Sequence, residues 1–494
     1  MKKYSIMKYK GIYIFALALI LLASCTKKLQ IENDSDPSIE DVYSDPASVY
    51  GVASSLFYNW YIGAQTHSWS PAMSMMTMAD QGTSSWLNSG MFDLSSEPRQ
   101  TFDNSESYRY AYIFEHYWTK LYADINTAND ILKVLDEGMV IGENGEDTKM
   151  VEAMSYFIHG LSLGYIGLNY DKAYILNYDT ENPSDVPISN YSDVTAAAIS
   201  SLEKCIAIAD ANNFIIPSDW INGKDYTNNE ISQLAHSYIA RFLVYNSRNA
   251  TQNDAINWQA VIDNANLGIT SDFEVFLDNV NWKNWVYHYS YERDDWVRVD
   301  ARIINLMDSS YTKRLTSGAD PGIATSIDAR LGTDFAHDNI CPFKPERGYY
   351  HYSFYLYKRI NYSFSTADYF PEMYKNEIDL LKAEAYAHLN QLPMAINILN
   401  TSSRISRGNL PPLSASATKQ QVLDAIFYER DIEFFVAGFG INYYDMRRRD
   451  MLQKGTMLHF PIPAKELNVI GLPIYTFGGE NNADGINTSN GGWL

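Results

Sequence analysis

The sequence has few of the residues that build metal sites and covalent cross-links. Its 494 residues include three cysteines and nine histidines, no two cysteines are spaced as C-x-x-C, and the histidines show no metal-ligand spacing. This excludes the usual zinc and redox signatures, and we predict neither a metal site nor a cofactor. Two features stay open: a disulfide between Cys205 and Cys341, and a weak calcium-loop resemblance from Asn482 whose twelfth position is Trp493 instead of glutamate.

Positive charge is also scarce. Lys and Arg number 38 against 59 Asp and Glu, which makes the net charge −21. Phosphate binding needs clustered Lys and Arg, so this charge argues against nucleic acid as a partner and against basic docking on anionic lipid. Aromatic residues, in contrast, are abundant, with 38 Tyr and 10 Trp.

Long apolar runs are missing except near the start of the chain. Residues 11–22 are apolar and follow four lysines, as in a secretory signal, and the run is too short to span a bilayer. It ends in Leu22-Ala23-Ser24-Cys25, which looks like a bacterial lipoprotein box; the alternative is an ordinary signal peptide with a chance cysteine. We predict a signal peptide over 1–24, lipidation of Cys25 and a tether over 25–40.

The lipid would be the only membrane anchor of this chain. Removing 1–24 takes away four lysines and no acid, so the mature net charge falls from −21 to −25. Thr26 follows the cysteine, where an aspartate would favour retention at the inner membrane, and we therefore predict an outer-membrane location.

The remaining chain has the apolar spacing of three and four that is typical of helices. The spacing predicts helices over 108–136, 148–168, 194–211, 230–248, 255–268, 373–389, 392–401 and 418–437. Strand signals are few and short, with one at Tyr349 to Ile360.

A small-residue and tyrosine pattern recurs along these helices. Ala383 and Tyr386 are followed by Ala395 and Leu399, as in a tetratricopeptide helix pair. Degraded copies start at Ala235-x-x-Tyr238 and Ala153-x-x-Tyr156. We predict a mostly α fold: a tetratricopeptide-like helical scaffold with long aromatic-rich loop insertions and few short strands. It would form one domain over 41–494, with halves 41–270 and 271–494, and such scaffolds bind partners.

Two segments between the predicted helices, 57–92 and 281–298, concentrate aromatic residues beside polar ones. A flat ring can stack on the apolar face of a sugar while amides and charges take its hydroxyls. The candidate glycan contacts are Trp69, Trp86, Asn88, Trp282, Trp285, Tyr287 and Tyr289. Stronger helical or alternating patterns place Trp60, Tyr61 and Trp296 in the core instead.

The C-terminal third carries a series of motifs in a specific order. They are Glu377 to Tyr386, Arg404, Arg407-Gly408, Ala425 to Phe434, Tyr444 to Arg448, and Pro461 to Leu467. Together with the lipoprotein box and the helix pairs, they resemble the SusD/RagB family of outer-membrane nutrient-binding lipoproteins. The resemblance is strongest over 372–463 and extends loosely over 40–470. It departs from the family at Phe439 and Asn442, where Glu and Arg are usual.

Charged residues within these motifs fall at helical offsets. Glu429, Arg430 and Glu433 share one predicted helix, and Asp445 and Arg447 follow shortly after it. We predict that these five residues form a structural ion network. The functional alternative is a catalytic pair of carboxylates.

Enzyme motifs are weak. Gly160 to Gly164 fits G-x-S-x-G, but it lies inside a helical pattern, whereas a nucleophile elbow needs a strand before the serine. The sequence holds no G-x-x-x-x-G-K-[ST] and no H-E-x-x-H. We therefore predict a protein that is not an enzyme.

The resemblance implies a surface-exposed lipoprotein that binds oligosaccharide and delivers it to a SusC-like TonB-dependent transporter. It also implies that segments 57–92 and 281–298 contact the glycan. Two alternatives stay open: a lipid-anchored glycoside hydrolase, and a periplasm-facing tetratricopeptide scaffold. The identity of the glycan, or whether the ligand is a peptide or glycoprotein, does not follow from the sequence.

Overall fold

The computed structural model describes residues 39–66, 70–291, 296–348 and 351–494. The predicted signal peptide, Cys25, most of the tether and Trp69 lie outside the described residues. The chain divides into a unit over Met1–Asp45, of which helix α2 (Ile39–Ser44) is described, and a compact unit over Pro46–Leu494. Everything below concerns the second unit, and its division into the halves 41–270 and 271–494 stays a prediction.

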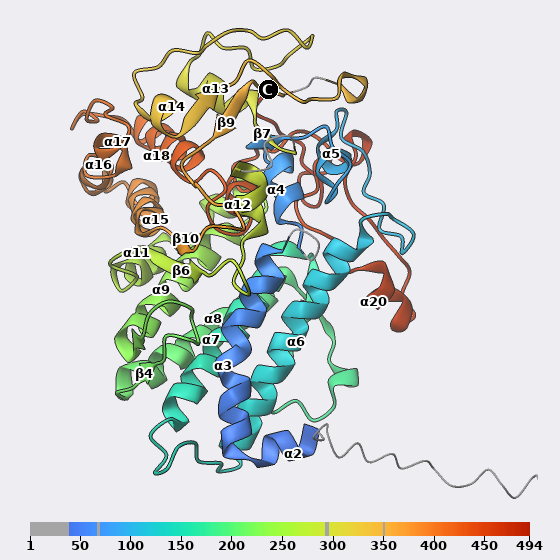
Figure 1. The fold of residues 1–494 in the computed structure, drawn as a ribbon, viewed down its shortest axis with the longest axis vertical. Coiled ribbons are helices and arrows are strands. Elements are labelled where there is room, and N and C mark those ends of the chain that lie inside the picture. Colours follow the sequence, from blue (N-terminus) through green and yellow to red (C-terminus); the bar gives the residue numbers. More distant parts are fainter. Residues whose placement is uncertain (1–38, 67–69, 292–295, 349–350) are drawn as a thin grey trace, which may run out of the picture. The chain divides into compact units, whose positions relative to one another are not determined.

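The second unit is mainly helical, as predicted (Figure 1). Its α-helices are α3 (Pro46–Gln65), α4 (Ala72–Met78), α5 (Met91–Ser95), α6 (Ala111–Asp136), α7 (Thr148–Asn169), α8 (Tyr191–Ala211), α9 (Asn228–Tyr245), α10 (Ala250–Asp254), α11 (Trp258–Asn266), α12 (Trp285–Tyr291), α13 (Ala301–Met307), α14 (Arg330–Thr333), α15 (Lys375–His388), α16 (Leu392–Leu399), α17 (Ser403–Ser406), α18 (Lys419–Glu433), α19 (Ile441–Arg447) and α20 (Ala464–Val469).

The strands of the described residues are short and pair only two at a time, antiparallel. They are β1 (Gly82–Thr83) with β7 (Arg298–Val299), β2 (Lys172–Tyr174) with β3 (Ile188–Asn190), β4 (Ile215–Ile216) with β5 (Tyr226–Thr227), β6 (Phe273–Leu277) with β10 (Asp368–Met373), and β8 (Phe335–His337) with β9 (Tyr355–Tyr357). Only β9 represents the strand expected over 349–360, and 349–350 lie outside the described residues.

The predicted helix pairs are present and lie along one side of the molecule (Figure 1). Helix α7 packs against α8, α9 against α11, and α15 against α16. In the last pair Ala383, Ala395 and Leu399 are fully buried, because small residues let the two helices approach closely. The tetratricopeptide-like scaffold is therefore confirmed. Tyr238 fills its groove completely, whereas Tyr386 is only partly buried.

Helix boundaries follow local capping. Thr227 with Glu230 and Thr418 with Gln421 form capping boxes, which satisfy the first free N–H groups of α9 and α18. Helix α18 ends at Glu433, four residues earlier than predicted. After it, Val436, Gly438 and Gly440 have left-handed backbone conformations, with positive φ. A right-handed α-helix cannot continue through such residues.

Segments 57–92 and 281–298 are less loop-like than predicted. Residues 57–65 complete α3, 72–78 form α4, and 285–291 form α12. The aromatic residues of α3 recur at spacings of three and four, so they form its buried face. Trp60 and Tyr61, predicted to be core residues, are buried there.

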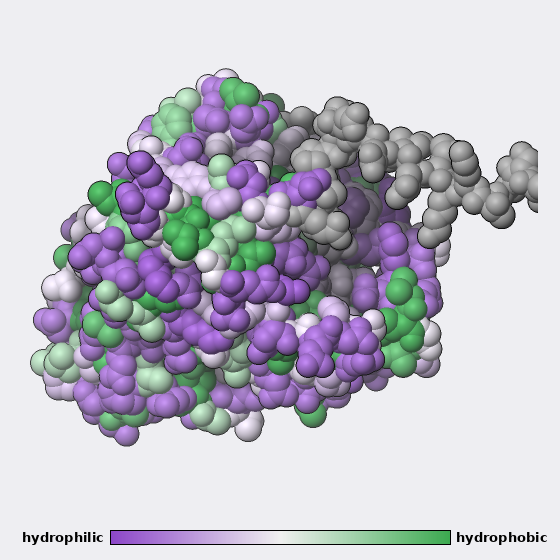
Figure 2. Space-filling model, turned by 90° about the horizontal axis from the view of Figure 1, so that it is seen from below, coloured by the Kyte–Doolittle hydropathy of each residue, from purple (hydrophilic) through white to green (hydrophobic). Residues whose placement is uncertain are grey.

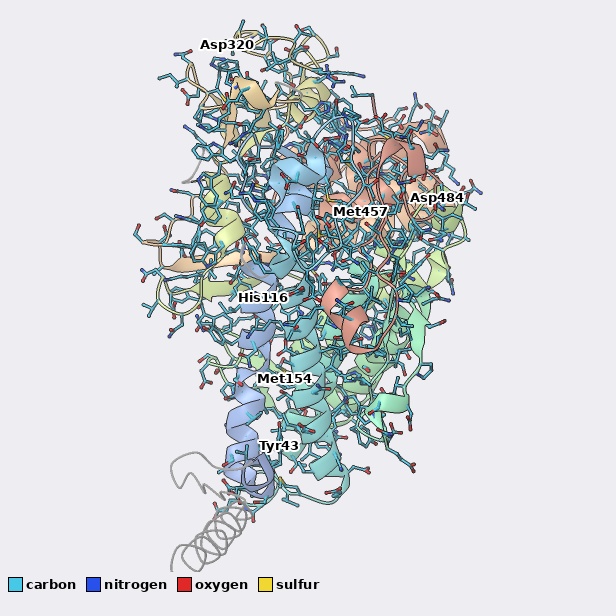
Figure 3. All side chains as sticks on the ribbon, turned by 90° about the vertical axis from the view of Figure 1, so that its right-hand side faces the viewer. Tyr43, His116, Met154, Asp320, Met457 and Asp484 are labelled. Atoms are coloured by element: carbon cyan, nitrogen blue, oxygen red, sulfur yellow. The ribbon has the colours of Figure 1, made fainter. Side chains whose placement is uncertain are left out.

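Side chains fill the space between the helices (Figure 3). Met154 of α7 lies in this interior and is fully buried, while Asp320 and Asp484 lie at the edge. The face seen in Figure 2 is mostly hydrophilic, with hydrophobic residues scattered over it. Cys205 is buried and Cys341 half-buried, and both are free thiols. No helix among the described residues combines the length and apolarity that a membrane span requires.

The G-x-S-x-G stretch lies in the middle of α7, without the preceding strand that a nucleophile elbow needs. A Cβ on Gly160 would lie 2.7 Å from Leu202 of α8, and one on Gly164 would lie 2.1 Å from the ring of Phe242 of α9. These glycines therefore allow α7 to pack closely against α8 and α9.

Gly164→Ala should lower the free energy of unfolding by about 1–3 kcal/mol, because Phe242 must move to make room. Gly51→Ala on α3, where no atom lies within 4 Å of the added Cβ, is the control and should stabilise by up to about 1 kcal/mol. Chemical denaturation measures both. Equal effects of the two substitutions would contradict the packing role of Gly164.

Candidate functional site

Glu429 and Glu433 belong to a buried ion cluster around Arg330. The Arg330 guanidinium donates to Glu429 at 2.8 and 3.0 Å, to Asp328 at 3.0 and 2.8 Å, and to Glu433 at 3.2 Å. The Glu433 side chain also pairs with Arg359 at 2.8 Å and Arg407 at 3.1 Å. Burial opposes ionisation of Asp328, but hydrogen bonds and charge from Arg330 outweigh it and lower its pKa.

Arg430 and Asp445 belong to a second buried cluster. Asp445 pairs with Arg430 at 2.9 Å and with Arg448 at 2.6 Å, and Arg448 holds Glu384 at 2.5 and 2.7 Å. Burial alone would raise the pKa of Glu384, but the opposing charge of Arg448 dominates and the pKa is lowered to about 2. Both carboxylates are therefore ionised when folded.

The single network expected from the sequence is thus two clusters. Glu429 and Glu433 are four apart and share one face of α18, whereas Arg430 points to another face. Arg447, which we expected in the ion network, forms no ion pair among the described residues. It donates to the carbonyls of Leu168, Leu458 and Tyr245 at 2.8–2.9 Å.

Phe439 and Asn442 stand where the resemblance leads us to expect a charged pair, and they contribute ring packing and a hydrogen bond instead. The Phe439 ring stacks on Tyr117 at 4.9 Å between centroids and meets Tyr165 edge-on at 5.6 Å. The Asn442 amide donates to the Phe434 carbonyl at 3.0 Å. Local order at this position is therefore kept without the salt bridge.

Trp86 and Asn88 lie on the Trp86 loop, residues 80–90. The loop is tied down at its start, where β1 pairs with β7 and Asp80 accepts from Arg99 at 3.0 Å and from the Trp493 indole at 2.7 Å. Gly82 is required there, since a Cβ would lie 2.8 Å from Val297. The chain beyond β1 is thus presented from a fixed base.

Trp86 itself is half-buried, with the Lys344 ammonium 4.6 Å from its ring centroid. The Lys344 backbone N–H donates to the Ser85 hydroxyl at 2.8 Å, which fixes segment 341–348 beside the loop. The indole N–H of Trp86 and both polar atoms of the Asn88 amide have no hydrogen-bond partner among the described residues. The loop therefore combines an aromatic face, a cation and unsatisfied polar groups.

The second predicted segment contributes mostly to the core. Trp282 is buried against Phe57 and Tyr58 of α3, and the buried Tyr287 donates its hydroxyl to the Pro371 carbonyl at 2.5 Å. Tyr289 is buried and stacks on Trp296 at 4.1 Å. Three of the four candidates on this segment are thus packed inside: Trp282, before α12, lies against α3, Tyr287 of α12 contacts β10, and Tyr289 of α12 lies against Trp296.

Trp285 is the exception. It is half-buried and meets the half-buried Phe364 edge-on at 4.4 Å, while His288 stacks flat on Phe364 at 3.9 Å. Trp296, predicted to be a core residue, is also half-buried. Because β1 pairs with β7, segments 80–90 and 296–299 approach one another, so the fold brings the bases of the two predicted regions together.

The structure adds a cleft that the sequence does not reveal, here called the Trp493 cleft. It measures about 470 Å³, and Arg302, Lys313, Phe427, Arg449 and Trp493 are among its lining residues. It adjoins the Trp86 loop, because Asp80 binds Trp493 and the Gln81 amide donates to Asp431 in the cleft wall at 3.2 Å.

These lining residues come from four distant parts of the chain, and no spacing pattern links them. The sequence marks Trp493 only as the twelfth position of the calcium-like stretch, where a calcium loop has glutamate. There the Asp484 carboxylate accepts three backbone N–H groups at 2.8–3.0 Å. No cluster of three or more metal-ligating side chains occurs in the described part of the chain.

Comparison with known proteins identifies the class of fold. Residues 323–469 match the model of the SusD family, a range that includes the motifs of 372–463. A SusD superfamily protein from Bacteroides vulgatus ATCC 8482 is 16% identical with a TM-score of 0.61, covering 86% of this chain and 97% of that one. A SusD homolog from Bacteroides thetaiotaomicron VPI-5482 is 12% identical with a TM-score of 0.59, covering 90% and 99%.

A third similar structure is that of a SusD-like carbohydrate binding protein from Bacteroides fragilis NCTC 9343. It is 15% identical with a TM-score of 0.58, covering 82% of this chain and 86% of that one. A search of curated proteins finds no match. The resemblance to the SusD/RagB family is therefore confirmed: the chain has a SusD-like helical fold, and residues 323–469 match the SusD family model.

Proposed function

We propose that this protein captures oligosaccharide, without chemistry, at the Trp86 loop and the adjoining Trp493 cleft. The observation that carries the proposal is the Trp86 loop itself: a half-buried indole beside Lys344 and an amide whose polar atoms lack partners, on a SusD-like fold. A buried polar group without a partner costs free energy. These atoms are covered by neighbouring protein groups, so a hydroxyl-rich ligand would offset that cost by displacing the groups that cover them.

The mechanism divides the contacts by chemistry. The rings of Trp86 and Trp493 would take the apolar faces of sugar units, each adding on the order of 0.5–1.5 kcal/mol beyond area burial. Asn88, Lys344 and Arg302 would form hydrogen bonds with the hydroxyl groups around the edge of the sugar. A few such contacts give an affinity in the micromolar range.

The pair of carboxylates that the sequence offers for hydrolysis is held by arginines. Glu429 and Glu433 are buried and ion-paired, which favours a structural role for them over protonation of a glycosidic oxygen. Incubation with oligosaccharides should therefore produce no new reducing ends. Product formation that one carboxylate substitution abolishes would favour a glycoside hydrolase instead.

Delivery completes the proposed function. We infer that Cys25 carries the lipid, that the protein faces the cell exterior at the outer membrane, and that a SusC-like TonB-dependent transporter receives the glycan. These inferences rest on the lipoprotein box and the SusD-like fold. Co-purification with an outer-membrane barrel tests the partner. Protease accessibility on intact cells separates a surface protein from a periplasm-facing scaffold.

Trp86→Ala should weaken oligosaccharide binding by about two- to tenfold, the effect of losing one stacked ring. Trp285→Ala, at the second predicted segment, should weaken it by less, because Trp285 is partly covered by Phe364. Calorimetry of the protein lacking residues 1–25 against a glycan panel measures both.

The matched control is Tyr369→Ala, which removes a ring that is 42% exposed on β10. It should leave the affinity unchanged. If no glycan binds, or if Trp86→Ala and Tyr369→Ala behave alike, the assignment of the Trp86 loop fails.

A further inference from the structure

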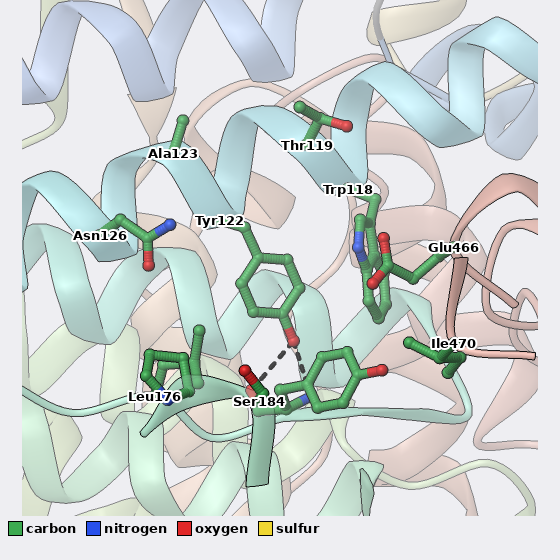
Figure 4. Close-up of a pocket in the computed structure, with 11 residues that line it drawn as sticks. Trp118, Thr119, Tyr122, Ala123, Asn126, Leu176, Ser184, Glu466 and Ile470 are labelled. Atoms are coloured by element: carbon green, nitrogen blue, oxygen red, sulfur yellow. Dashed lines mark hydrogen bonds between the residues drawn. The ribbon is translucent and has the colours of Figure 1, made fainter. Parts of the chain in front are cut away.

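A second cleft lies on a different part of the molecule, between α6, the chain from β2 to residue 184, and α20 (Figure 4). We call it the Trp118 cleft. It measures about 570 Å³, within the range of small-molecule sites. None of its lining residues belongs to the Trp86 loop or the Trp493 cleft.

Three aromatic rings form one side of this cleft. Trp118 and Tyr122, one turn apart on α6, lie 4.9 Å apart, and Tyr174 of β2 lies 6.2 Å from Tyr122. The planes are inclined to each other by 51° and 64°, so the rings form a cup instead of a flat stack.

The cup is held rigidly. The Tyr122 hydroxyl donates to the Tyr174 carbonyl at 2.9 Å and accepts from the Tyr174 backbone N–H at 2.7 Å (Figure 4). Both polar functions of this hydroxyl are therefore used inside the protein. What Tyr122 offers a ligand is the face of its ring.

Among the described residues that line the cleft, Glu466 of α20 is the one that carries a formal charge. Its carboxylate lies beside Trp118 in Figure 4, is half-buried, and has no cationic or hydrogen-bonding partner among the described residues. Burial raises the pKa of Glu466, and no neighbouring cation offsets that effect. The contrast with Glu384 and Glu429 is clear, since those carboxylates are each held by arginine.

We propose that the Trp118 cleft binds an organic ammonium group, such as the protonated amine of an amino sugar or a quaternary ammonium. Ring faces carry negative potential and attract cations, and an unpaired carboxylate beside them attracts the same charge. Around the rim, Asn126, Thr119 and Ser184 are exposed and can take hydroxyl groups of such a ligand.

A neutral ligand fits this cleft less well. It would stack on the same rings, but it would displace water from Glu466 without pairing the charge, which costs free energy. The cation is therefore what the geometry selects. This inference does not depend on glycan capture at the Trp86 loop.

Ligand-observed NMR and calorimetry on the purified protein test the proposal with pairs of structurally related ligands, one cationic and one neutral. Choline is compared with its neutral isostere 3,3-dimethyl-1-butanol, and glucosamine with N-acetylglucosamine. Each cation should bind about tenfold more tightly than its neutral partner. The pair with the tighter cation then separates a quaternary ammonium from an amino sugar as the preferred source.

Two substitutions assign the site. Glu466→Gln keeps the shape of the side chain and should weaken cation binding about tenfold, while Glu137→Gln, at the exposed C-terminal end of α6, should not. Tyr174→Leu should weaken it as well by removing one ring. A thermal melt of each variant verifies folding. Equal binding of cations and neutral isosteres, or cation binding that Glu466→Gln leaves intact, would overturn the proposal.

Discussion

Replacing Arg330 with methionine should lower the free energy of unfolding by about 3–5 kcal/mol, because it leaves buried carboxylates without their counter-charge. Asp328 and Glu429 are fully buried and each receives two hydrogen bonds from Arg330. Among the described residues, Glu429 would keep Arg404 at 3.8 Å and the Ser403 hydroxyl at 3.1 Å. Urea denaturation at neutral pH measures the change.

The control is Arg109→Met, which removes an exposed arginine that lies over the ring of Tyr110 and has no ion pair among the described residues. It should cost less than about 1 kcal/mol. A second variant separates loss of charge from loss of volume: Arg330→Lys keeps one charge but cannot hold two carboxylates bidentately, so it should recover only part of the loss. A small effect of Arg330→Met would show that the carboxylates find other partners or protonate.

Asp124→Asn should raise the free energy of unfolding at pH 7 by about 2–4 kcal/mol. Asp124 lies on the inner face of α6 and is 3% exposed. Its Oδ2 has no hydrogen-bond partner among the residues that the structure describes. Burial raises the pKa of Asp124 to about 8, and Lys120, one turn earlier, only partly offsets that effect. An asparagine needs no ionisation and keeps the shape.

The pH dependence of this gain has a definite sign. Below about pH 4 the Asp124 carboxyl is protonated in both the folded and the unfolded chain, so the substitution should be nearly neutral. Between about pH 4 and pH 8 the unfolded chain loses the proton while the folded protein keeps it, so wild-type stability falls relative to Asp124→Asn. The gain should therefore grow as the pH rises, by up to about 1.4 kcal/mol per pH unit.

Asp136→Asn, an exposed carboxylate on the same helix, is the matched control and should show no such growth. Denaturation of both variants and the wild type at pH 5 and pH 7 provides the comparison. Titration of Glu384 does not affect this comparison, because its lowered pKa of about 2 changes the stability only as the pH falls below about 4.5. A gain of equal size at both pH values would mean that Asp124 is ionised in the folded protein.

The sequence by itself determined eight of the helices and how they pair, but it did not reveal the 20-residue helix α3. Apolar spacing, which reports a buried face directly, predicted eight helices from α6 to α18, and the small residues Ala235, Ala383 and Ala395 predicted where helices approach. The order of the motifs in 372–463 indicated the resemblance to the SusD/RagB family, and the family-model match covers this range. Trp86 was placed in a loop because glycine and serine surround it, and that signal is local.

Only the tertiary structure decided which residues meet. Trp282 is buried against α3, and Tyr287 and Tyr289 are buried on the inner side of α12; no pattern in 281–298 distinguishes these three residues from Trp285. The clusters around Arg330 and Arg448 join residues from 328 to 433 and from 253 to 448. The Trp493 and Trp118 clefts likewise join distant segments, because clefts and ion pairs depend on the path of the backbone between elements, which local periodicity does not encode.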